Sequence, residues 1–203
     1  MSKLVLNTAP DTTPIVLADV KTHLRWDDAA GSDSFDSDAY LNTLIDNAVD
    51  MAETETWSRF IDQTWDLHLD GFPTEIVLPY PPTDSITEIT YTDTAGDTQT
   101  LSSDVYELGA PSRVGVVRLK YGQSWPTPRA HADVVKVTYK CGYGTSGSDV
   151  PDAINHALKL IVAHLATNRG DEDAGRPSQW NPIDMPRAAR VLLSQYSFRS
   201  PSP

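Results

Sequence analysis

Residues 64–70, with the sequence TWDLHLD, mark the point at which the chain changes from helical to strand patterning. Apolar and polar side chains alternate through this segment, which is the period of a strand with one buried face. The apolar positions are Trp65, Leu67 and Leu69, and the polar positions are Asp66, His68 and Asp70. We therefore expect a half-buried strand here, with the rest of a sheet following it.

Six further short segments after this strand have strand character, and turn signals separate them. The segments are 75–78, 85–92, 98–101, 105–108, 114–120 and 133–139. The turns between them include GFP at 71–73, PYPP at 79–82, TAGD at 94–97 and GQSWPTP at 122–128. Strands this short, joined by such turns, predict an antiparallel sheet or a small barrel rather than βαβ units.

On both sides of this β region the apolar residues recur at helical spacing, so the predicted fold class is α+β with an antiparallel β insertion in the middle. Helices are predicted over residues 15–25, 39–59, 151–168 and 186–196, and the longest places Leu41, Leu44, Ile45, Ala48 and Ala52 on one face. The predicted parts are an N-terminal helical part at 1–61, the β insertion at 62–144, a C-terminal helical part at 145–196 and a mobile tail at 197–203.

The charge of the chain limits what it binds. The 203 residues carry a formal net charge of −12, whereas proteins that bind free DNA usually present a basic face. The stretch from Asp27 to Glu55 contains acidic residues and no lysine or arginine, while residues 176–203 contain four arginines and one acid, Asp184. An acidic body with a basic tail suggests a separate partner for the tail; a solvated acidic face with a disordered tail is the alternative.

Cys141 is the only cysteine, which excludes an intrachain disulfide and a two-cysteine redox or zinc site. We expect it to be a small apolar residue at the end of a strand. No apolar run approaches the ~20 residues that span a bilayer, and the N-terminus lacks the apolar stretch of a signal peptide. No membrane association is therefore expected.

The chain contains none of the common catalytic or nucleotide-binding motifs, so we expect no enzyme activity and no catalytic, cofactor-binding or metal-ligating residues. Asp66 and Asp70 lie four residues apart on one strand, about 13 Å, which exceeds the ~5–9.5 Å of paired glycosidase carboxylates. The loop at 27–38 holds Asp33, Asp36 and Asp38 but lacks the EF-hand order of ligands. A solvated, helix-capping loop is expected there, and calcium binding stays open.

The order of the segments resembles the phage head–tail connector (adaptor) family of long-tailed phages, prophages and gene-transfer particles. The landmarks are PIVLADVKTHLRWDD at 14–28, AETETWSRFIDQTWDLHLDGFP at 52–73, IVLPYPPTDSITEITYTDTAG at 76–96, VKVTYKCGYG at 135–144 and VPDAINHALKLIVAHLATNRG at 150–170. The resemblance covers about residues 14–195. It lies in the sequence of landmarks, since no single motif is chemically distinctive.

This resemblance implies a helical core built from the N-terminal and C-terminal helices, which pack together around the β insertion as one compact unit. It also implies a non-enzymatic subunit of the virion neck, made in the bacterial host cytoplasm. The subunit would form a ring, with twelve copies in the particle, beneath the portal protein and above stopper or tail-side neck proteins. DNA would pass through the ring only as cargo. The implied portal-facing residues are Arg187, Arg190, Tyr196, Phe198 and Arg199.

Three features of this interpretation are open from the sequence. The acidic helix at 39–59 faces either the channel or the outside of a ring. Trp180, in a polar loop, is either an anchor for a partner protein or packs onto its own domain. The alternative function is a carbohydrate- or receptor-binding β module of a virion, in which Trp65, Tyr91 and Trp125 would build a sugar site. A tail that orders only on contact with the portal predicts a monomer or weak oligomer in isolation.

Overall fold

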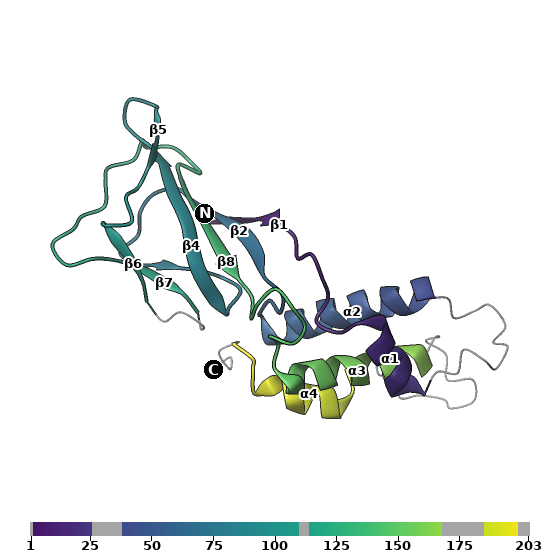
Figure 1. Cartoon of the computed structure of the whole chain (residues 1–203). Helices are drawn as coiled ribbons and strands as arrows, with labels where there is room; N and C mark the ends of the chain where they lie inside the picture. The colour runs from purple at the N-terminus through teal and green to yellow at the C-terminus, as the bar shows by residue number, and fades with distance from the viewer. Residues whose placement is uncertain (1, 26–37, 110–113, 168–184, 199–203) are drawn as a thin grey trace, which may run out of the picture. The chain divides into compact units, whose positions relative to one another are not determined.

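A computed structural model describes residues 2–25, 38–109, 114–167 and 185–198. The chain forms two compact units (Figure 1). The β unit comprises Met1–Asp11 and Ser58–Thr145, and the helical unit comprises Thr12–Trp57 and Ser146–Pro203. Both ends of the β region therefore lead into helical segments that belong to one unit.

The strands of the β unit pair in the antiparallel manner that the sequence predicts, but the described residues form two sheets and not the single sheet or small barrel expected. The larger sheet has the strand order β1-β2-β8-β4-β5, and the smaller has the order β3-β7-β6. The strands are β1 (Lys3–Thr8), β2 (Gln63–Leu69), β3 (Ile76–Val77), β4 (Thr83–Thr92), β5 (Thr98–Thr100), β6 (Tyr106–Gly109), β7 (Val116–Leu119) and β8 (Val135–Cys141). Together with four helices, these strands confirm the α+β fold class.

The sequence does not predict strand β1. Its residues lie in the N-terminal part, which was expected to be helical. It pairs with β2 along the edge of the larger sheet, with Leu4 opposite Leu67 and Leu6 opposite Trp65. Most of β1 is exposed, including 43% of Leu6. An edge strand with little buried surface has no clear alternation of apolar and polar residues. It is recognised as a strand only by its pairing with a distant segment.

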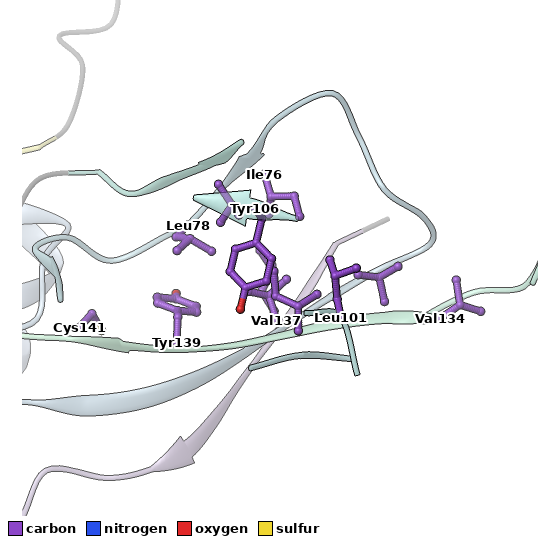
Figure 2. Packing of buried hydrophobic residues seen from close by; sticks show 12 residues of the cluster. Ile76, Leu78, Leu101, Tyr106, Val134, Val137, Tyr139 and Cys141 are labelled. Atoms are coloured by element: carbon purple, nitrogen blue, oxygen red, sulfur yellow. The ribbon is translucent and has the colours of Figure 1, made fainter. Parts of the chain in front are cut away.

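The core of the β unit lies between the two sheets. Every second residue of β8 is fully buried: Val135, Val137, Tyr139 and Cys141. Figure 2 shows Val137 and Tyr139 on the side of β8 that faces Ile76, Leu78 and Tyr106. The Tyr139 hydroxyl donates to the Pro79 carbonyl at 2.7 Å, and burial raises the pKa of this phenol, so it remains a protonated donor. The predicted role of Cys141, a small apolar residue at a strand end, is confirmed.

The helical unit is organised around α3 (Asp152–Thr167), which contacts α1 (Leu17–Leu24), α2 (Asp38–Thr56) and α4 (Arg187–Ser194). The apolar face predicted for residues 39–59 is buried, and so are apolar faces on α3 and α4. They comprise Leu41, Leu44, Ile45, Ala48 and Ala52 on α2, Ile154, Ala157, Leu158, Ile161 and Val162 on α3, and Ala189 and Leu193 on α4. The N-terminal and C-terminal helices thus share one core.

Helix α2 ends three residues before the predicted boundary at Arg59. Trp57 adopts a left-handed backbone with φ of 56°, which ends the helical hydrogen bonding. The Arg59 N–H instead donates to the Pro81 carbonyl at 3.0 Å, and its guanidinium lies 3.7 Å from the centre of the Tyr80 ring. Residues 58 and 59, which were predicted to belong to the helix, are therefore part of the β unit.

The burial of α4 predicts that Leu193→Ala will destabilise the helical unit. Removing a fully buried leucine side chain costs about 2–5 kcal/mol. Val191 on the same helix is 57% exposed, and Val191→Ala is expected to change the free energy of unfolding by no more than about 0.5 kcal/mol. Urea unfolding followed by circular dichroism at 222 nm compares the two variants. Equal effects would show that α4 is not part of the core.

Candidate functional site

The C-terminal segment from Arg187 to Phe198 contains four of the five residues expected to contact a portal. Helix α4 holds it in place through Ala189 and Leu193, which are fully buried. On the other side of the helix Arg187, Arg190 and Val191 are exposed. The structure thus presents the arginines on the outer face of a helix that is anchored in the core.

The two arginines of α4 have different surroundings. Arg190 lies beside the last turn of α2, with Nε 3.6 Å from Oε1 of Glu55. That turn carries acidic residues and no basic one, although the C-terminal end of a helix favours positive charge. Arg190 therefore compensates an unfavourable charge on α2. Arg187 has no ion-pair or hydrogen-bond partner among the described residues, and its side chain is exposed.

The residues after α4 return to the end of α2. The Phe198 N–H donates to the Thr56 carbonyl at 3.0 Å, which satisfies one of the carbonyls that a helix end leaves without an internal donor. The Tyr196 N–H donates to the Leu193 carbonyl at 2.9 Å, and both aromatic residues are half-buried. Phe198, in the segment predicted to be a mobile tail, is tied to α2 in this structure.

Trp57 follows Thr56 at this same end of α2, and the sequence analysis did not select it. A left-handed conformation costs a residue with a side chain about 1–2 kcal/mol, and glycine is the usual residue at this position after a helix. The Trp57 side chain nevertheless remains 42% exposed. No local sequence pattern predicts the left-handed backbone of Trp57.

Several predicted features lie outside the described residues. These are Arg199, Trp180 and residues 27–37 of the loop in which calcium binding stays open. Asp38, the last residue of that loop, begins α2 and pairs with Lys21 Nζ at 2.8 Å. Among the described residues, no cluster of three or more histidine, cysteine or acidic side chains is arranged to bind a metal.

The acidic residues of α2 lie off its buried face, and Glu53 and Glu55 are half-buried. Asp46 and Asp50 are exposed, one helical turn apart, and alternate with polar Asn42, Asn47 and Thr54. Helix α2 carries no basic side chain, and neither carboxylate has an ion-pair partner among the described residues.

The three aromatic residues proposed for a sugar site do not come together. Trp65 packs beside Tyr80, with ring centres 4.9 Å apart, whereas Trp125 stacks on Phe72 at 4.9 Å. Tyr91 contacts the same Phe72. The register places Trp65 opposite Tyr139 and Tyr91 opposite Val135, four residues apart on β8, or about 13 Å. All three aromatic residues proposed for the site pack against the core of the β unit.

The carboxylates of Asp66 and Asp70 likewise serve separate structural contacts. Asp66 accepts hydrogen bonds from Thr138 Oγ1 at 2.6 Å and Asn7 Nδ2 at 3.0 Å, and these contacts tie three strands together. Asp70 accepts from the Asp133 N–H at 3.1 Å. Partial burial alone would raise the pKa of Asp66, but the hydrogen bonds from Thr138 and Asn7 outweigh it and lower the pKa below 3.8. Asp66 is thus ionised at neutral pH, which suits an acceptor.

In the part of the chain that the structure describes, no helix is both long and apolar enough to cross a bilayer. No protein-family model matches the chain, and no curated protein matches it either.

Solved structures share the fold over nearly the full length of the chain. A chain in the neck of an empty gene transfer agent (GTA) particle, computed with C6 symmetry, has a TM-score of 0.77 and 22% identity, with 99% of this chain and 98% of that chain covered. A chain in the virion of the native GTA particle has a TM-score of 0.75 and 21% identity, with 98% of each chain covered. A chain in the native GTA neck, computed with C12 symmetry, has a TM-score of 0.73 and 20% identity, with coverage of 99% and 98%. At these identities the likeness establishes the fold.

The Asp66 contacts predict a pH-dependent effect of Thr138→Val. Because the pKa of Asp66 is lowered in the folded state, its stabilising contribution is present above pH 3.8 and is lost as the pH falls through the lower folded pKa. We expect the variant to lose about 1 kcal/mol at pH 7 and distinctly less near pH 2. Urea unfolding at both pH values measures this. Thr90→Val, on the same sheet face opposite Lys136, is the control and should show no such pH dependence.

Proposed function

We propose that this chain is a structural head–tail adaptor subunit of a phage-like particle. In this role it forms a ring beneath the portal, links the portal to stopper or tail-side neck proteins, and lets DNA pass through the centre. The observation that carries the proposal is the shared fold with GTA neck chains over 98–99% of both chains. The subunit would be made in the host cytoplasm and reside in the virion neck.

The charge of the chain supports this role. A ring that lets DNA slide must not bind the phosphates tightly, and a net charge of −12 repels them. The exposed face of α2, with Asp46 and Asp50, would provide such a non-binding wall if it faces the channel. The proposed activity is mechanical and architectural, and it requires no catalytic group.

The C-terminal segment is the proposed portal-facing part. Arg187 is exposed and without a partner among the described residues, so it is suited to a carboxylate on another protein. Tyr196 and Phe198, which follow the other end of α4, add half-buried aromatic side chains to the segment. Arg190 would contribute less to binding than Arg187, because Glu55 already neutralises part of its charge.

Binding to the portal protein of the same particle tests the proposal. Deleting all residues after Asp184 would remove the buried Met185, Ala189 and Leu193, so single substitutions are the cleaner test. We expect the wild-type chain to co-purify with portal rings and Arg187→Glu to bind about tenfold more weakly, a loss of about 1.4 kcal/mol. Arg129→Glu, a charge reversal at an exposed arginine of the β unit, is the control. Absence of wild-type binding would contradict the adaptor assignment.

The purified chain without portal is expected to sediment as a monomer or weak oligomer. Its ring contacts would become stable only on the portal, because binding there holds many copies at high local concentration. Sedimentation velocity at micromolar concentration measures the state. A stable twelve-copy ring of the isolated chain would rule out this order of assembly.

A further inference from the structure

The end of helix α2 and the segment that follows α4, up to Phe198, lie together. Phe198 is joined to Thr56 by a backbone hydrogen bond of 3.0 Å, and Trp57 follows Thr56 directly. Arg190 is held at the same place by Glu55, at 3.6 Å. Two segments that are about 140 residues apart in the sequence thus meet at the end of α2, where Trp57 is exposed and Phe198 is half-buried.

We propose that Trp57 belongs to the portal-binding surface together with Tyr196 and Phe198. This inference rests on the proposed adaptor function and adds to it a residue that lies far from the C-terminal segment in sequence. The docking surface is then composite, built from the last turn of α2 and from residues 187–198, and not from the C-terminal segment alone.

The conformation and exposure of Trp57 support an interaction role. Its backbone is left-handed, where glycine is favoured, yet the residue is a tryptophan that keeps 42% of its surface exposed. Backbone outliers of this kind concentrate at functional surfaces. Tryptophan is also among the residues that contribute most to binding energy when a partner covers it.

The charge of the surface indicates the chemistry of the partner. The described residues 185–198 include Arg187 and Arg190 and no acidic residue. A complementary partner presents an apolar pocket for the aromatic rings and a carboxylate near Arg187. A second copy of this chain offers carboxylates on α2, at Asp46 and Asp50, but that exposed face is otherwise polar and provides no apolar pocket. Because Trp57 adjoins the segment already proposed to face the portal, through the Phe198–Thr56 hydrogen bond, the portal is the proposed occupant of this surface.

Trp57→Gly tests the inference with the full chain, because glycine accepts the left-handed backbone and leaves the end of α2 its conformation. We expect binding to purified portal rings, measured by biolayer interferometry, to weaken about tenfold or more. The matched control is Tyr121→Ser, which removes a fully exposed aromatic side chain from a turn of the β unit and should leave binding unchanged. Phe198→Ala should weaken binding as well, and the double variant should lose less than the sum of the two losses.

Circular dichroism and sedimentation of each variant separate the outcomes. If the wild-type chain binds portal and Trp57→Gly binds equally well, the inference is overturned and the adaptor function stands; if the wild-type chain fails to bind, both fall. A change in self-association without a change in portal binding would assign the surface to contacts between copies and overturn the inference. A loss of binding that is accompanied by a loss of helicity in both Trp57→Gly and Trp57→Asn would also overturn the inference. Asparagine serves as the second variant because it also tolerates this backbone.

Discussion

Strand β8 is the constraint on which the rest of the β unit depends. It pairs on one side with β2 and on the other with β4, so Cys141 lies opposite both Gln63 and Thr83. Its alternate side chains are completely buried between the sheets. Because a shift of one residue would move this apolar set to the polar face, the register of the whole sheet is determined by the core.

The end of β8 also connects the sheet to the helices. After Cys141 the chain keeps its hydrogen bonding to neighbouring strands, since the Gly142 N–H donates to Pro82 and the Tyr143 N–H donates to Phe60. Gly142 has a φ of +136°, and a Cβ atom there would come within 2.7 Å of Asp62 backbone atoms. The GYG sequence thus serves close packing of backbones within the β unit. This close approach explains the glycine at position 142.

In the helical unit, α3 has the equivalent central place. It contacts the three other helices, and through Ala189 and Leu193 it fixes α4, which in turn brings Arg190 and Phe198 to the end of α2. The proposed portal surface is therefore a consequence of core packing. Its aromatic and basic groups are held by buried residues, which lowers the conformational entropy lost when a partner binds. The same arrangement makes deletion of the C-terminal segment a poor way to study binding.

Much of the fold could be predicted from local patterns, because burial on one face imposes a period of 2 on strands and 3.6 on helices. The strand at 64–70, the four helices and the antiparallel class follow from that. Strand β1 did not, since an exposed edge strand such as Lys3–Thr8 has little burial to pattern it and exists through its pairing with β2. The end of α2 did not either, because the left-handed Trp57 leaves no periodic signal.

For the candidate site, the sequence alone determined the charge asymmetry and the residue types at the C-terminus. Only the tertiary structure decided which of them are available. Arg190 is engaged by Glu55 while Arg187 is not, and the Phe198 N–H donates to the carbonyl of Thr56, the residue before Trp57. Contacts between residues 55–57 and 190–198 depend on how α4 packs against α3 and α2, which no local period encodes. The sequence thus determined which residue types are present at this surface, and the packing of the helices determined which of those residues come together there.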